Sequence, residues 1–181
     1  MARRREQRGS KSAWPPDPEM MSTSFHATDP YERLRALGIS LPHPPTPVAN
    51  FLPAVRTGNL LFVSGQGPVG PGGVRHTGKV GATVSTEEAY EHARLTTVNL
   101  LAIMHEALGS LSHVTRIVKV LGMVNATAEF SEHPRVINGC SDLLVAVFGQ
   151  DIGKHARSAV GMGSLPGQIT VEIELIAAVK D

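Results

Sequence analysis

The order in which the hydrophobic period changes along the chain constrains its fold more than any other feature. Residues 86–108 place apolar side chains at helical spacing; a Ser85–Glu88 capping box precedes them and Gly109 follows. A second run of helical period covers residues 133–148. Runs of strand type are predicted around these helices, at residues 51–56, 60–64, 116–124, 157–163 and 168–179. This order predicts an α+β fold, a mixed β-sheet with two helices packed on one face.

The last predicted strand indicates how the two faces of the sheet differ. Its apolar and polar residues alternate, with Ile169, Val171, Ile173 and Leu175 set against Thr170, Glu172 and Glu174. One face therefore lies in the core, and the other meets solvent, a partner or a pocket. Because the helices cover one face only, we expect an oligomer in which a partner covers the other.

The first residues do not share this periodicity. Residues 1–27 are polar, basic and contain prolines, which predicts a disordered basic tail ahead of a single domain at 28–181. Three interpretations of the tail stay open: an over-long reading frame with Met20 or Met21 as the start, a nucleic-acid-binding arm, and an organelle-import peptide.

Three local patterns complete the domain. A short helix is predicted from Asp29, its N-cap, to Gly38. A proline-rich connector follows at residues 41–47. Residues 67–83 are rich in glycine and predict a long flexible loop, which lacks the pattern of a phosphate-binding loop.

Composition excludes several classes of protein. The formal net charge of +1 is too small to attract nucleic acid by field alone. The single cysteine, Cys140, excludes an internal disulfide and a cysteine-rich zinc site, and its position on the second helix predicts buried packing. No apolar run reaches the length of a membrane span. We therefore expect a cytoplasmic protein that binds no metal, membrane or nucleic acid.

Three stretches of the chain carry a family signature. The first is the pattern G-N-x-x-x-x-S-G-Q at residues 58–66, and the second is Asn138 on the second helix. The third runs from Ala-Arg-Ser at 156–158 through Leu-Pro at 165–166 to Val-Glu-Ile-Glu at 171–174. Together they resemble the RidA family, also called YjgF, reactive intermediate deaminase or endoribonuclease L-PSP-like, in a divergent branch with longer loops.

The resemblance implies a fold, an assembly and a reaction. Proteins of this family have a chorismate-mutase-like fold and form homotrimers with ligand clefts between subunits. Their best-known members hydrolyse 2-imino acids, or the enamine tautomers, to 2-oxo acids and ammonia without a metal or organic cofactor. The resemblance therefore implies an imine or enamine deaminase (a hydrolase) that acts on a small substrate bearing a carboxylate.

Two residues are the candidate catalytic groups. Arg157 resembles the family arginine that holds the substrate carboxylate, a role that suits a planar, permanently charged guanidinium. An intersubunit ion pair is the other interpretation of Arg157. Glu172 resembles the family glutamate that orients the attacking water, and a carboxylate can move protons in both steps of imine hydrolysis. We favour Glu172 over Glu174 because its 15-residue separation from Arg157 matches the family spacing.

Four further residues are candidates for substrate binding. Ser64 and Gly65 close a strand where family members contact the ligand, and glycine permits close approach. Asn138 resembles a family asparagine near the cleft. Phe51 stands where many imine-hydrolysing members have tyrosine, so the ring is kept and the hydroxyl is lost. Two interpretations of His155, which precedes the signature, stay open: a residue that lines the cleft, and an exposed loop residue, which is favoured.

Two other functions stay open. The Phe51 substitution is compatible with a protein that binds a small carboxylate without turning it over, and also with a pathway-specific hydrolase of a more apolar substrate. RNA cleavage is not favoured, because the predicted domain has no basic stripe interleaved with aromatic residues.

Overall fold

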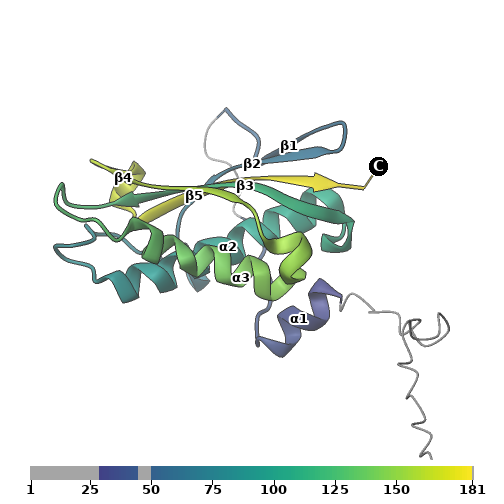
Figure 1. The fold of residues 1–181 in the computed structure, drawn as a ribbon, viewed down its shortest axis with the longest axis horizontal. Helices are drawn as coiled ribbons and strands as arrows, with labels where there is room; N and C mark the ends of the chain where they lie inside the picture. Colours follow the sequence, from purple (N-terminus) through teal and green to yellow (C-terminus); the bar gives the residue numbers. More distant parts are fainter. Residues whose placement is uncertain (1–28, 45–49, 181) are drawn as a thin grey trace, which may run out of the picture.

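The computed structural model describes residues 29–44 and 50–180 (Figure 1). The predicted tail at residues 1–27 lies outside this range, as does part of the proline-rich connector. The elements in chain order are α1 (Pro30–Ala36), β1 (Ala54–Thr57), β2 (Leu60–Gln66), α2 (Thr86–Leu108), β3 (Val114–Asn125), α3 (His133–Gly153), β4 (Ala156–Met162) and β5 (Val171–Val179). After α1, this is the order of strands and helices that the sequence predicts.

The strands form one mixed sheet in the order β1-β2-β5-β3-β4. The pairs β1–β2, β2–β5 and β5–β3 are antiparallel, and β3–β4 is parallel. Both long helices lie against the same face of the sheet, with α1 beyond them (Figure 1). The predicted fold class, a mixed sheet with two helices on one face, is confirmed.

The helix boundaries follow their local chemistry. Ser85 and Glu88 form the predicted capping box at the start of α2, and Gly109 ends it in the left-handed region with φ of 72°. The predicted end of the second helix at Gly149 is a break rather than an end. Gly149 leaves the helical region with φ of 80°, and one further turn carries α3 on to Gly153.

Two predictions about the first half of the domain need correction. The strand predicted at 51–56 begins only at Ala54, because Pro53 has no N–H to continue the ladder. The glycine-rich segment at 67–83 is a loop but is tied down. Its Val80 is fully buried and bridges Ala126, and the side chain of Asn99 on α2 donates to backbone carbonyls of the loop.

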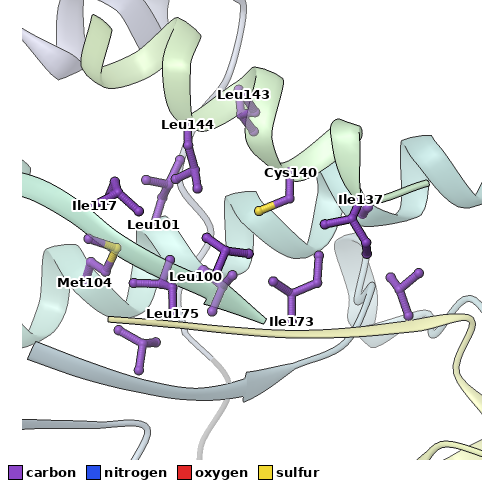
Figure 2. Close-up of a cluster of buried hydrophobic side chains, with 14 of the residues drawn as sticks. Leu100, Leu101, Met104, Ile117, Ile137, Cys140, Leu143, Leu144, Ile173 and Leu175 are labelled. Atoms are coloured by element: carbon purple, nitrogen blue, oxygen red, sulfur yellow. The ribbon is translucent and has the colours of Figure 1, made fainter. Parts of the chain in front are cut away.

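The core lies between the sheet and the two long helices. Figure 2 shows side chains from α2, α3, β3 and β5 meeting in this layer: Leu100, Leu101, Met104, Ile117, Ile137, Cys140, Leu143, Leu144, Ile173 and Leu175. Cys140 is fully buried, as predicted, and burial raises the pKa of its thiol to about 12. The thiol is therefore protonated and unreactive at neutral pH.

No α-helix of residues 29–44 and 50–180 lies over the opposite face of the sheet (Figure 1). β5 alternates as predicted, with Ile173 and Leu175 buried toward the helices and Glu172 on the other side. On this open face the side chains of Phe62 and Val160 are 41% and 39% exposed. Among the helices of the described residues, none is long and apolar enough to cross a membrane.

Candidate functional site

Glu172 lies on the open face of the sheet. It pairs with Met123 of β3, and both side chains point away from the helices. The side chain is half-buried, and burial raises the pKa of its carboxyl group, with the nearby carboxylate of Glu174 raising it further. No donor within the described residues bonds to this carboxylate. A carboxyl group with a raised pKa is a stronger base than an ordinary glutamate, which suits it to accept and return a proton.

Gly65 on β2 adjoins Glu172, and Ser64 precedes it. A Cβ on Gly65 would collide with the carboxylate of Glu172, so glycine leaves room for this side chain in its present position. The pairing of β2 with β5 shifts register in this stretch, between Val63 and Gln66. The hydroxyl of Ser64 donates to the carbonyl oxygen of Leu52 at 2.7 Å.

Phe51 lies just outside β1 and has no part in the sheet. Its ring is 48% exposed, and it precedes Leu52, the residue that holds the hydroxyl of Ser64. Phe51 is thus linked to the Ser64 stretch of β2 only through its sequence neighbour Leu52. Its ring presents carbon atoms alone to any ligand there.

Arg157 lies on β4 and turns toward the helices. Its Nη1 donates to Oδ1 of Asn138 at 2.8 Å and to Oγ of Ser141 at 3.0 Å, both on α3. These bonds use both hydrogens of Nη1. Within the described residues, no acceptor meets Nε or Nη2, and no carboxylate pairs with Arg157. The guanidinium is therefore partly held and still offers one planar edge.

The structure does not bring Arg157 and Glu172 together in one chain. Arg157 pairs with Val120, whose side chain faces the helices, whereas Glu172 points from the opposite face. Their strands are separated by β3, and the register places them three residues apart along the strands. Strand spacing and rise put the two Cα atoms roughly 14 Å apart. The candidate residues thus form two half-sites, Arg157 with Asn138 and Glu172 with Ser64 and Gly65.

Two further polar residues lie beside Arg157: Ser141, which the sequence did not single out, and His155. His155 is half-buried, so the favoured interpretation of it as an exposed loop residue is wrong. Its Nδ1 lies 2.7 Å from the carbonyl oxygen of Gly153, and its Nε2 lies 3.1 Å from Oγ of Ser141. Burial lowers the pKa of His155, as does the charge of Arg157, while the bond to Gly153 acts in the opposite direction.

One sequence signal could have indicated this cluster. Ser141 follows Asn138 by three residues on a helix, which places the two side chains on one face. His155 precedes Arg157 by two residues. The contact itself depends on how α3 packs on β4, and that is not visible in either segment alone.

Metal binding has no support in the geometry of the half-sites. Across residues 29–44 and 50–180, no three side chains of His, Cys, Asp or Glu gather closely enough to hold an ion.

Comparison with known proteins agrees with the fold and the signature. The family model described as "YjgF/chorismate_mutase-like, putative endoribonuclease" matches residues 31–178. The chain is 38% identical to Protein TCP17 of Trypanosoma cruzi over 148 residues, covering 82% of this chain and 92% of that protein. It is 33% identical to the 2-iminobutanoate/2-iminopropanoate deaminase of Escherichia coli over 147 residues, covering 77% and 94%.

Solved structures extend the same likeness. A crystal structure of a protein of unknown function from Agrobacterium tumefaciens superposes with a TM-score of 0.76 at 42% identity, covering 84% of this chain and 93% of that one. The region matched by the family model contains both half-sites and all of the sheet except the last residue of β5. The chain therefore belongs to the YjgF, or RidA, family and has its chorismate-mutase-like fold.

Proposed function

We propose that this protein is a hydrolytic deaminase of reactive imines and enamines, converting a 2-imino acid and water into a 2-oxo acid and ammonia. The observation that carries the proposal is the open donor edge of Arg157, which no carboxylate of the described chain occupies. A planar guanidinium edge of this kind matches a substrate carboxylate. The likeness to an Escherichia coli protein named as such a deaminase supports the reaction.

The proposed assembly is a homotrimer whose clefts lie between subunits. Arg157 and Glu172 lie on opposite faces of one sheet, so a small substrate cannot touch both within one chain. An interface that sets the β4 edge of one subunit against the open face of another would unite them. The exposed apolar side chains of Phe62 and Val160 on that face favour burial against a second copy.

In the proposed reaction, Arg157 holds the carboxylate while Glu172 handles protons. The substrate reacts as the protonated imine. The oxygen of water bonds to the imine carbon, the π pair of the C=N bond moves to the nitrogen, and Glu172 takes a proton from the water, which gives a neutral carbinolamine. Glu172 then returns this proton to the nitrogen, the C–N bond breaks and ammonia leaves. The proton of the remaining hydroxyl passes to the released ammonia, giving ammonium and the carbonyl of the 2-oxo acid. The raised pKa of Glu172 suits both transfers.

The test follows imine loss directly. An amino-acid oxidase generates 2-imino acids from a panel of amino acids, and the protein is added before spontaneous hydrolysis is complete. We expect faster imine loss with the wild type, little with Arg157→Ala, and wild-type rates with Arg35→Ala, which removes an exposed arginine of α1. No acceleration across the panel, from wild-type protein that is folded, would contradict the proposal.

A second candidate function is binding of a small carboxylate without turnover. Phe51 favours it, because the ring beside Leu52 lacks a hydroxyl that could hold water or substrate. Titration calorimetry with 2-oxo acids separates the candidates. Tight binding that Arg157→Ala abolishes and Glu172→Ala leaves unchanged, without any turnover, would establish the binding function in place of the enzyme.

A further inference from the structure

A chain of hydrogen bonds with a fixed direction ends at Arg157. The carbonyl oxygen of Gly153 can only accept, so Nδ1 of His155 carries the ring hydrogen in their 2.7 Å contact. Nε2 of His155 is then an acceptor, and the hydroxyl of Ser141 donates to it at 3.1 Å. Oγ of Ser141 keeps its lone pairs for Arg157, which has no acceptor of its own.

This chain determines which edge of the guanidinium stays open. Ser141 and Asn138 together take both hydrogens of Nη1, which fixes the plane of the group. Nε and Nη2 then point the same way as a parallel pair of donors, the arrangement that a carboxylate accepts bidentately. If Ser141 could rotate freely, Arg157 would lose one of its two anchors.

We propose that Ser141 and His155 are positioning residues that orient Arg157 toward a planar carboxylate. The inference rests on the proposed function, since it assigns the same arginine to the substrate. Neither residue touches the substrate: His155 acts through Ser141, and Ser141 acts through Arg157.

The surroundings of His155 keep the relay in this direction. A protonated His155 would donate from both nitrogens, and Ser141 would no longer have Nε2 as its acceptor. The cation Arg157 is one charged neighbour of His155. The carboxylate of Asp142, the residue after Ser141 on α3, already accepts a hydrogen bond from Tyr90 of α2. Burial and the charge of Arg157 both favour the neutral ring, so the hydroxyl of Ser141 stays directed at Nε2.

Matched substitutions at His155 separate positioning from packing. Asn places its amide N–H near the site of Nδ1 and has nothing at the site of Nε2, whereas Gln places its amide oxygen near Nε2. We expect His155→Asn and Ser141→Ala to raise KM for a 2-imino acid about 10-fold, the effect of losing one hydrogen bond to a charged group, with kcat nearly unchanged. His155→Gln and Ser141→Thr retain the relay and should stay close to the wild type.

A binding measurement makes the inference testable apart from turnover. The Kd of 2-oxobutanoate, measured by calorimetry, should rise about 10-fold in His155→Asn and stay within about twofold in His155→Gln. Binding that follows this pattern without any turnover would remove the proposed function and keep the positioning role. Equal effects of Asn and Gln, a fall in kcat with KM unchanged, or no binding by the wild type would overturn the inference.

The tautomer of His155 gives a direct spectroscopic check. Long-range proton–nitrogen correlation should show the hydrogen on Nδ1 in the wild type, with the Nε2 resonance shifting in Ser141→Ala as its donor is lost. A hydrogen on Nε2 in the wild type would reverse the direction of the chain and overturn the inference.

Discussion

A carboxyl group that must take and return protons works best when its pKa lies above the ordinary range of glutamate. Glu172 meets this condition because it is half-buried beside a second carboxylate and has no donor from the described residues. Glu174, two residues along the same strand, is exposed. The two glutamates on this face of β5 therefore differ in burial, and burial is the main cause of the raised pKa of Glu172.

The raised pKa makes Glu172 costly for stability at neutral pH. Its charged form is less favourable in the folded chain than in the unfolded chain. Glu172 therefore contributes stability at pH values below its pKa in the unfolded chain. This contribution is lost as the pH rises through its higher pKa in the folded chain. We expect Glu172→Gln to raise Tm at pH 7, with the gain fading toward pH 4, and to lower kcat about 10²–10⁴-fold.

Thermal melts and imine kinetics on the same samples check both effects. Glu174→Gln is the control: at pH values above the acid limb it should change kcat little, because Glu174 is exposed. A Glu172→Gln variant that is less stable than the wild type at pH 7 would show that the carboxylate makes a favourable contact in the assembled protein.

The same pair predicts a shift in the pH profile. Glu172 must be ionised to accept a proton from water, so kcat/KM falls on the acid side as it protonates. Glu174→Gln removes a charge that raises the pKa of Glu172, and the acid limb should move to lower pH. Exposed Glu106 on α2 gives the control variant, Glu106→Gln, in which the limb should not move. If the acid limb of kcat/KM does not move in Glu174→Gln, the limb reports the titration of a group other than Glu172.

At the scale of elements, the ends of a helix can be predicted from the sequence where residues next to the helix determine them. The caps of α2 depend on Ser85, Glu88 and Gly109, all adjacent to the helix, and all three were predictable. The start of β1 and the break at Gly149 were not. Strand ends depend on a partner strand, and a glycine inside a helical pattern shows its conformation only when the helix is packed.

Close packing of α2 on α3 depends on Gly139. A Cβ at this position would overlap the backbone carbonyl of Tyr90, which cannot move aside as a side chain would. We expect Gly139→Ala to lower the free energy of unfolding by about 1–3 kcal/mol, the usual cost of overpacking, although alanine is the better helix former. Urea denaturation measures the difference.

Gly163 provides the matched control for this prediction. It lies just after β4, and nothing stands within 4 Å of a Cβ placed on it. Gly163→Ala should therefore change the free energy of unfolding by less than about 0.5 kcal/mol. If the two alanine variants have similar free energies of unfolding, α2 and α3 can move apart at Gly139 without destabilising the fold. Their close contact would then contribute little to stability.

At the scale of the whole molecule, the sequence predicts the layers but not their connections. Alternation in β5 shows that one face of the sheet is buried, and the number of helices shows that the other is open. The position of β5 between β2 and β3 comes from long-range pairing that no local pattern records. For the same reason, the placement of Arg157 and Glu172 on opposite faces could not be predicted from their 15-residue spacing.

This placement leads to a test of whether the site lies between subunits. Arg157→Ala and Glu172→Ala should each be inactive alone. Unfolded together in equal amounts and refolded as mixed trimers, they should regain about a quarter of the wild-type activity. In a cyclic trimer, one site in four then combines an intact Arg157 from one subunit with an intact Glu172 from the next.

Refolding each variant alone is the control for this complementation, and sedimentation confirms that the mixed sample is trimeric. A site within one chain would recover nothing on mixing, because every chain would still lack one of its two groups. If mixed trimers form but regain no activity, the protein is a trimer whose site does not lie between subunits. Recovery would place the carboxylate-binding group and the proton-transferring group of one site on different subunits, which agrees with their positions on opposite faces of one sheet.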